Sequence, residues 1–288
     1  MLWEEYVSPA SIKRALDVLE SYKGEARVIA GGTDLVPELK SGARKVKCLV
    51  DISGVKSLQK IEEDGENIKI GAGVTHSRVA ASKLIRERAM VLAEAAFAVG
   101  SPLIRNQGTV AGNVINAQPA ADTAVALFAL DAMAQITASS GTRLVPIADL
   151  YKGIGESKVD SASEMLTALY FKKLKENQGS AFARLAQRKA LALPMLNVAV
   201  VVTVSDGRFK EARIVVAPVA PTPFRAIQAE AVLKGAPVNR DSILKAAEAA
   251  QAEAQPRDSA LRGSAEYRKE MVKVLVRRAL EQAVLRAK

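Results

Sequence analysis

The spacing of apolar residues at the N-terminus predicts a helix followed by two short strands. The helical spacing is carried by Ile12, Ala15, Leu16 and Leu19. Ser8 precedes a proline, which is typical of a helix cap, and Gly24 is expected to end this helix. Strands are expected over residues 27–30 and 47–52, with a helix through residues 35–39 between them. A strand, a helix and a strand in this order predict a small parallel sheet.

From residue 58 onward, alternating apolar and polar residues predict hairpins. Asp64-Gly65 lies between the expected strands 58–63 and 67–71, and Ser140-Gly141 marks a second turn. A further strand is expected over residues 164–171. Apolar stretches predict helices over residues 78–84, 90–99 and 123–130.

The C-terminal part has a hairpin and then three helices. Asp206-Gly207 separates the expected strands 198–204 and 212–219. Helices are expected over residues 223–234 after a Thr222 cap, 241–254 after an Asn239 cap, and 264–287. Strands followed by helices predict an α+β fold. The chain is expected to divide into three parts, over residues 1–56, 57–176 and 177–288.

Cysteine and histidine limit the chemistry of this chain most strongly. Its 288 residues contain one cysteine, Cys48, and one histidine, His76. These two residues cannot form a disulfide, an iron–sulfur cluster or a His/Cys zinc site within the chain. Cys48 is interpreted as a small buried strand residue. Any redox centre in the chain must therefore be an organic cofactor.

The net charge of +10 is concentrated near the C-terminus. Residues 262–288 include eight basic and three acidic residues and so supply about half of it. The basic residues are spread around the expected helix, which indicates a solvated helix face or a docking surface for an acidic protein. An aromatic content of 4% disfavours nucleic-acid binding. Asp131 interrupts the apolar stretch 123–138, and the first residues lack a secretory signal, so we expect a cytoplasmic protein without a transmembrane segment.

Two glycine-rich segments carry the candidate binding chemistry. The first, Ala30-Gly31-Gly32-Thr33-Asp34, follows an expected strand. Glycine backbones can approach a ligand closely, and successive N–H groups can bind phosphate oxygens. Thr33 is expected to cap the next helix and to offer its hydroxyl. The alternative is a tight turn in which Asp34 is only a helix cap.

The second segment, Gly108-Thr109-Val110-Ala111-Gly112-Asn113, continues as small residues with Asn116 and Asp122 among them. Amides and hydroxyls donate to a diphosphate, and a carboxylate accepts from the hydroxyls of a ribose or ribityl chain. Asp122 either has this role or caps the helix 123–130. Two such segments without a Walker lysine predict a large diphosphate ligand held by two elements.

Two further motifs have weaker signals. The segment 71–76 resembles the start of a dinucleotide fingerprint, but it follows a hairpin strand and has His76 at the third glycine position. His76 is interpreted as a helix cap rather than an acid or base. Residues 182–189 form a basic run, which is either a solvated connector or a segment that brings Arg184 to the ligand.

Taken in order, these motifs resemble the FAD-binding (medium) subunit of the molybdenum hydroxylase family, which includes xanthine dehydrogenases and aerobic carbon monoxide dehydrogenases. The resemblance extends over residues 30–35, 108–114, 119–122, 182–188, 197–200, 220–226 and 264–268. It implies a vanillyl-alcohol-oxidase-type (PCMH) FAD-binding domain of two α/β subdomains, followed by a C-terminal α+β domain with an antiparallel sheet and three helices. Arg184 stands where the family often has Lys, and Ala111 where many relatives have Gly.

The resemblance also implies which residues bind FAD. Those expected around the diphosphate are Ile29, Ala30, Gly31, Gly32, Thr33, Asp34 and Leu35, with Gly108, Thr109, Gly112 and Asn113. Asn116 and Asp122 are expected near the sugar or ribityl chain, with Ile115 in the same set. Ile104 is expected near the adenosine, Leu166 beside the flavin, and Arg184 facing it.

The activity implied by the resemblance is electron transfer. Substrate is oxidised at a molybdenum cofactor in a large partner subunit, and electrons pass through two [2Fe–2S] clusters of a small partner to FAD in this chain. They then leave for an external acceptor, in an assembly expected to be a dimer of heterotrimers. No residue of this chain is expected to be catalytic toward the organic substrate, and no nucleic acid is expected as a partner. The alternatives are a stand-alone FAD-dependent oxidoreductase and a basic nucleic-acid-associated protein.

Overall fold

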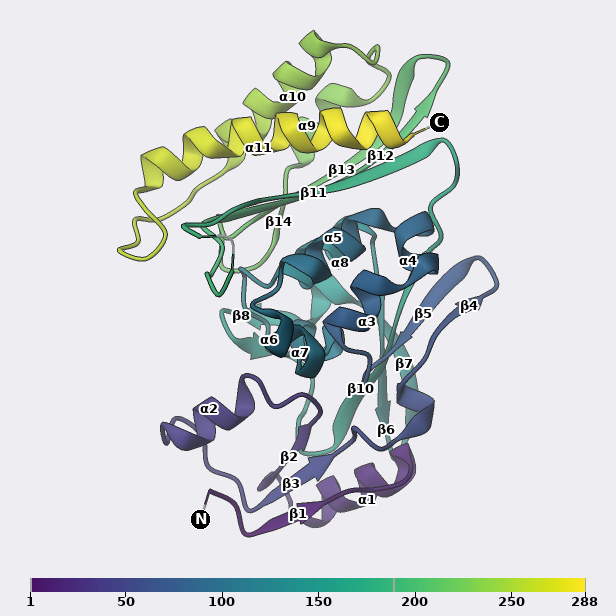
Figure 1. Ribbon diagram of the computed structural model, residues 1–288, viewed down its shortest axis with the longest axis vertical. Helices are drawn as coiled ribbons and strands as arrows, with labels where there is room; N and C mark the ends of the chain where they lie inside the picture. The colour runs from purple at the N-terminus through teal and green to yellow at the C-terminus, as the bar shows by residue number, and fades with distance from the viewer. Residues whose placement is uncertain (1, 189, 288) are drawn as a thin grey trace. The chain divides into compact units, whose positions relative to one another are not determined.

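The computed structural model describes residues 2–188 and 190–287 (Figure 1). Met1, Lys189 and Lys288 lie outside the described residues. The same three residues fall within the expected parts 1–56 and 177–288. The chain forms two compact units. The first comprises Met1–Val79, Pro102–Ala117 and Ala132–Lys172, and the second comprises Ala80–Ser101, Gln118–Asp131 and Lys173–Lys288. The boundaries expected near residues 56 and 176 stay predictions.

The first unit contains the small parallel sheet that the sequence predicts. β2 (Ala26–Ile29) pairs with β3 (Cys48–Asp51), and the helix α2 (Leu35–Lys40) lies between them in sequence. β3 also pairs in parallel with β1 (Glu5–Val7), a strand that the sequence analysis missed because it is three residues long and begins with a charged residue. The buried thiol of Cys48 lies in β3, as predicted.

Helix caps explain where the N-terminal predictions were wrong. The helix α1 (Ile12–Ser21) begins three residues later than predicted, because Ser11 rather than Ser8 accepts a hydrogen bond from the N–H of Arg14, at 3.2 Å. The N-cap residue of α2 is Asp34 and not the predicted Thr33. The Asp34 side chain makes no capping hydrogen bond.

The second sheet of this unit is antiparallel and five-stranded, in the order β4-β5-β10-β6-β7. The predicted hairpins form it: β4 (Ile61–Asp64), β5 (Asn67–Gly71), β6 (Met133–Ala138), β7 (Gly141–Pro146) and β10 (Glu164–Lys172). A β-bulge at Thr167 interrupts the pairing of β10 with β6. Shorter elements complete the unit: η1 (Lys56–Leu58), α6 (Pro102–Gln107), α7 (Val110–Ile115), η2 (Ile147–Leu150), β8 (Tyr151–Gly153) and β9 (Glu156–Ser157).

The helix predicted over residues 78–84 is two short helices. They are α3 (His76–Ala81) and α4 (Lys83–Arg88), and the Ser82 hydroxyl between them caps α4 by accepting from the N–H of Ile85, at 3.4 Å. The helix α5 (Met90–Ala98) follows, close to the predicted range.

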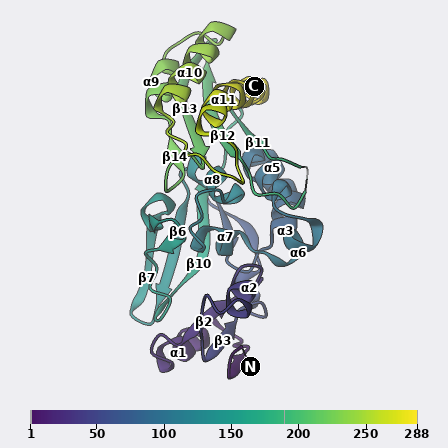
Figure 2. The same cartoon turned by 90° about the vertical axis from the view of Figure 1, so that its left-hand side faces the viewer.

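The second unit is an antiparallel sheet with helices on both faces (Figure 1 and Figure 2). Its strands are β11 (Gln178–Leu185), β12 (Leu196–Ser205), β13 (Arg208–Ala217) and β14 (Phe224–Arg225), in that order. The predicted helices α9 (Ile227–Leu233), α10 (Arg240–Glu253) and α11 (Ala265–Arg286) cover one face, and α5 and α8 (Asp122–Ala129) the other. The α+β prediction is confirmed.

Coverage on both faces explains why β12 contains an unbroken run of valine and alanine over residues 198–202. Val198, Val200 and Val202 belong to the core formed with α9, α10 and α11, whereas Ala199 and Val201 alternate with them and are equally buried. The helix α11 lies directly on β11. A Cβ on Gly179 would lie 1.8 Å from the carbonyl oxygen of Ala283, so only glycine permits this approach.

Two predictions in this unit were wrong in detail. The helix predicted from residue 223 begins only at Ile227, because Phe224 and Arg225 form the edge strand β14. The basic run from residue 182, for which a solvated connector was one interpretation, forms part of β11 as far as Leu185. The predicted cap Asn239 is confirmed and accepts from the N–H of Ser242 at 2.9 Å, whereas Ser264, predicted as the first residue of its helix, is the cap and accepts from the N–H of Tyr267 at 3.2 Å.

Basic residues of α11 bind inside the unit, which corrects the interpretation of a wholly solvated face. Arg268 is buried and donates to the backbone carbonyls of Met195, Pro218 and Arg257. Arg286 donates to the carboxylate of Glu94 and to the carbonyl of Ser180. No helix in the described residues is both long and apolar enough to cross a membrane.

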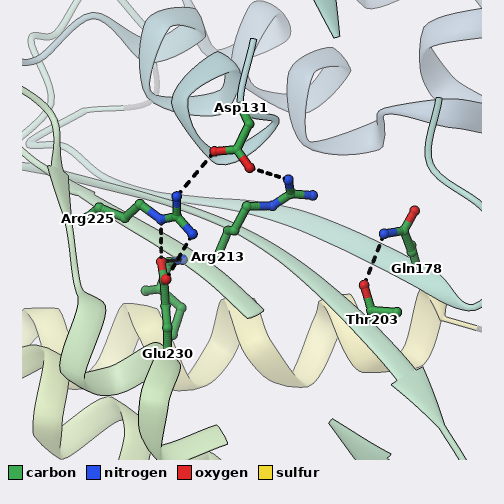
Figure 3. A network of polar contacts seen from close by, with 7 residues as sticks. Asp131, Gln178, Thr203, Arg213, Arg225 and Glu230 are labelled. Atoms are coloured by element: carbon green, nitrogen blue, oxygen red, sulfur yellow. Dashed lines mark hydrogen bonds and ion pairs between the residues drawn. The ribbon is translucent and has the colours of Figure 1, made fainter. Parts of the chain in front are cut away.

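A network of charged side chains joins the end of α8 to β13, β14 and α9 (Figure 3). Asp131 accepts from Arg213 at 2.5 Å and from Arg225 at 3.3 Å. Glu230 accepts from Arg225 Nε at 2.8 Å and from the N–H of Ile214 at 2.9 Å. The side chain of Glu230 is 11% exposed, against 49% for Asp131. The two carboxylates therefore differ in how strongly solvent screens them.

We expect Glu230→Ala to lower the free energy of unfolding by about 2–3 kcal/mol, because it leaves the buried N–H of Ile214 without an acceptor and removes the 2.8 and 3.0 Å hydrogen bonds of Arg225. Asp131→Asn, the matched control in the same network, should cost less than about 1 kcal/mol, since its carboxylate is half exposed and asparagine tolerates the left-handed backbone at this position, φ +48°. Urea unfolding of both variants measures the difference. Equal losses would show that burial does not distinguish the two carboxylates.

Candidate cofactor site

The first glycine segment connects β2 to α2 and leaves a run of backbone donors open. Its carbonyls are used, since those of Gly32 and Asp34 accept from the first N–H groups of α2. Within the described part of the chain, the N–H groups of Gly31, Gly32, Thr33 and Asp34 donate no hydrogen bond. Gly32 has φ +65°, which a glycine adopts without strain. Four successive open donors at one turn suit an anionic ligand.

The second glycine segment lies against the first. A Cβ on Gly31 would lie 2.1 Å from the carbonyl oxygen of Gln107 and 2.8 Å from Cα of Gly108. A Cβ on Gly108 would in turn lie 3.3 Å from Oγ1 of Thr33. The structure thus brings together two segments that are far apart in the sequence. We call residues 29–35 and 104–113 together the cradle.

A β-bridge fixes the position of the second segment. Thr75 and Thr109 pair in antiparallel orientation, with the N–H of His76 donating to the carbonyl of Gly108 at 3.0 Å and that of Val110 to Val74 at 3.1 Å. Thr109 caps α7, because its hydroxyl accepts from the N–H of Gly112 at 3.1 Å. The helix α7 carries Asn113 and Ile115, and Asn116 is its half-buried C-cap.

Ile104 and Leu166 are both placed in the first unit. The carbonyl of Ile104 in α6 accepts from the N–H of Gly108 at 2.7 Å, so this residue starts the turn into the second segment. Leu166 is buried in β10, next to the bulge at Thr167. Bulges re-aim neighbouring side chains, and this one changes the direction of the strand beside Leu166.

The environment of His76 differs from the predicted helix cap. Thr75 caps α3 instead, since its hydroxyl accepts from the N–H of Arg78 at 3.4 Å. The His76 side chain is 3% exposed, and its Nδ1 has no hydrogen-bond partner among the described residues. Burial, with a smaller contribution from the nearby charge of Arg105, lowers the pKa of His76 to about 4. The ring is therefore neutral near pH 7.

This pKa makes stability sensitive to acid. The unfolded chain binds a proton at His76 below about pH 6.5, whereas the folded chain does so only near pH 4, so acidification between these values favours unfolding. The histidine should reduce the free energy of unfolding by about 2 kcal/mol between pH 7 and pH 5. Urea unfolding of wild type and His76→Gln at both pH values isolates this contribution. A difference between the two proteins that does not change with pH would contradict it.

Asp122 and Arg184 lie in the second unit and bind each other. Arg184 Nε donates to Asp122 Oδ1 at 2.9 Å, and the side chains are 12% and 9% exposed. Arg184 also donates to the carbonyl of Ala192. Burial raises the pKa of Asp122, and the Arg184 charge opposes that shift. Asp122 does not cap α8 with its side chain, since Ala121 is the N-cap residue and makes no side-chain hydrogen bond.

The cradle fits an FAD diphosphate by its chemistry. It combines open backbone N–H donors, the hydroxyls of Thr33 and Thr109, and glycines whose Cβ atoms would fill the space where the segments meet. No group of three His, Cys, Asp or Glu residues that could hold a metal ion exists in the described ranges. The sequence analysis missed the carbonyl of Gln107 and the bridge from Thr75. A contact between backbones leaves no signal in the side chains of the sequence. The glycines of segment 71–76 could, however, have indicated that this segment lies close to the second glycine segment.

Comparisons with known proteins match the whole chain. A family model described as the FAD binding domain in molybdopterin dehydrogenase matches residues 3–171, and one for the CO dehydrogenase flavoprotein C-terminal domain matches residues 181–283. The chain is 33% identical to the carbon monoxide dehydrogenase medium chain of Afipia carboxidovorans, over 99% of this chain and 98% of that one. It is 30% identical to a putative xanthine dehydrogenase FAD-binding subunit of Escherichia coli, over 98% and 96%. A solved structure of carbon monoxide dehydrogenase from Hydrogenophaga pseudoflava superposes with a TM-score of 0.93, at 30% identity and 99% coverage of both chains.

Proposed function

Because this chain belongs to the family of FAD-binding medium subunits of molybdenum hydroxylases, we propose that it carries electrons from an iron–sulfur partner through FAD to an external acceptor. The family identification, the FAD-binding fold and the oxidoreductase class predicted from sequence are confirmed. FAD, when bound, supplies a centre that accepts and releases one or two electrons. The chain's own residues bind this cofactor and orient it.

The contact between Gly31 and the Gln107–Gly108 backbone carries this proposal. It holds the open backbone donors of the first segment against the second segment, which adds the hydroxyl of Thr109, so that both can serve one anion. In the proposed site the N–H groups and hydroxyls of the cradle bind the diphosphate. The Asn116 amide donates or accepts and the Asp122 carboxylate accepts at the sugar or ribityl chain, with Ile115 beside them. Ile104 contacts the adenosine, Leu166 the flavin, and Arg184 faces the flavin.

The proposed partners hold the metal centres, since this chain has too few cysteine ligands for an iron–sulfur cluster. One cysteine cannot supply the thiolates of a [2Fe–2S] cluster within this chain. In the proposed assembly, as the family resemblance implies, a small partner subunit holds the clusters and a large one holds the molybdenum cofactor. The relatives named medium chain or FAD-binding subunit support this division of labour. We propose a dimer of heterotrimers in the cytoplasm.

The decisive experiment uses the complex purified with its partners. Flavin and metal content are measured first, and then the iron–sulfur clusters are reduced anaerobically and the flavin and cluster absorbances are followed in time. We expect the flavin absorbance to bleach as the clusters reoxidise. The clusters should reoxidise in this way only in preparations that contain FAD. A folded complex without flavin, or a flavin reduced by organic substrate in the isolated chain, would contradict the proposal. The second result would favour a stand-alone oxidoreductase.

A further inference from the structure

The segment from Gly71 to His76 connects the five-stranded sheet to the second glycine segment. At the sheet, the N–H of Ala72 donates to the carbonyl of Thr167 in the bulge at 3.0 Å, and the N–H of Gly73 donates to Leu58 at 2.9 Å. At the other end, the N–H of His76 donates to Gly108 at 3.0 Å. Both ends of the segment are therefore fixed by backbone hydrogen bonds. The position of the second glycine segment thus depends on that of the sheet.

The ring of His76 packs beneath Gly108. Its Cδ2 lies 3.4 Å from the point that a Cβ on Gly108 would occupy, which is van der Waals contact. Nε2 is bonded directly to Cδ2, the ring atom that makes this contact, whereas Nδ1 is not bonded to it. Nδ1 lies on the far side of Cγ, buried and without a partner among the described residues. The two nitrogens of this ring therefore have different surroundings.

This difference selects one tautomer. A buried N–H without an acceptor is rarer than a buried acceptor without a donor, because the unmade bond of the donor costs more. The proton of the neutral ring therefore resides on Nε2, next to the ring atom that contacts Gly108. Burial keeps the ring neutral, so it offers this N–H without adding a charge to the site.

We propose that His76 is a binding residue for the cofactor, and that its Nε2–H donates a hydrogen bond to the FAD diphosphate while its ring supports Gly108. This inference rests on the proposed function, since it assumes that the cradle holds FAD. It gives a role to a side chain that the sequence interpretation assigned to a helix cap.

Three variants of the purified complex test the proposal. His76→Leu keeps an apolar side chain beneath Gly108 and removes the donor, and His76→Gln keeps a neutral N–H donor. Lys83→Ala is the control, because Lys83 lies on the next helix, its side chain is 89% exposed and its ion pair is with Glu87, outside the cradle. The measurements are the dissociation rate of FAD, the thermal midpoint of each complex and the ³¹P NMR signals of bound FAD. We expect FAD to leave His76→Leu at least about 10-fold faster, and to leave His76→Gln and Lys83→Ala within about 3-fold of wild type.

The outcomes separate a binding role from a merely structural one. A His76→Leu complex with wild-type FAD release would overturn the inference, as would a His76→Gln complex that releases FAD as fast as His76→Leu. If His76→Leu fails to assemble, the ³¹P signals of His76→Gln decide: a shift of the diphosphate resonances supports contact, and unchanged resonances contradict it. A wild-type complex without FAD would instead remove the proposed function itself.

Discussion

Replacing Gly31 by alanine is expected to abolish FAD retention. The added methyl would lie 2.1 Å from the carbonyl oxygen of Gln107, far inside contact distance, so the two segments of the cradle must separate. Separation removes at least two charge-assisted hydrogen bonds to the diphosphate, each worth about 1.5–3 kcal/mol. The affinity for FAD should therefore fall by more than about 100-fold. Equilibrium dialysis of the flavin-depleted complex with FAD measures this loss.

The matched control is Gly54→Ala. Gly54 lies in the same unit, has nothing within 4 Å of a built Cβ and does not have a left-handed backbone conformation. It should bind FAD with wild-type affinity. If Gly31→Ala also retains FAD, the contact between the two segments is not what forms the site, and the role of the cradle must be abandoned.

Breaking the Asp122–Arg184 pair is expected to produce the second large effect, on stability. Removing one partner of a buried pair leaves an uncompensated charge, which costs about 3–5 kcal/mol. Asp122→Ala should show that loss at all pH values, since the guanidinium left behind cannot release its proton. Arg184→Met leaves a carboxyl group that can be protonated, so its loss should shrink as the pH falls from 8 toward 5.

Urea unfolding of both single variants and of the double variant, at two pH values, measures these effects. The double variant should lose less than the sum of the single losses, because neither charge then remains alone. The exposed pair formed by Lys210 and Asp206 in the same unit is the control, and Asp206→Asn, which keeps a residue that tolerates the left-handed backbone there, should cost less than about 1 kcal/mol. Additive losses in the buried pair would indicate that the two side chains do not stabilise each other.

The parts of the fold that were predictable are those in which a side chain carries the signal. Asn239 and Ser264 start helices with a side-chain oxygen, and both helices begin where predicted. Ser8 has the same chemistry as Ser11 and was the wrong choice, because tertiary packing decides which serine caps. The helix α9 begins after Ala226, which has no capping oxygen, and the sequence offered no reason to expect the preceding strand.

The candidate site was predictable in its glycines and not in its contacts. Glycine pairs indicate close approach, but nothing in the sequence says that Gly31 approaches the backbone at Gln107. Arg184 and Asp122 were each predicted to face a ligand, and their mutual ion pair could not be inferred because 62 residues separate them. Their roles toward FAD stay predictions.

The interleaving of the two units has a consequence for how the gene can be divided. The helices α5 and α8 lie within the first family match yet form one layer of the second unit. A fragment that starts near residue 177 would contain the sheet β11–β14 without that layer of helices. The side chains of Ala199, Val201 and Val215 would then be exposed to solvent. The two halves should therefore aggregate when translated as separate polypeptides. We expect soluble protein only when the two fragments are co-expressed, because each then supplies the part of the fold that the other lacks.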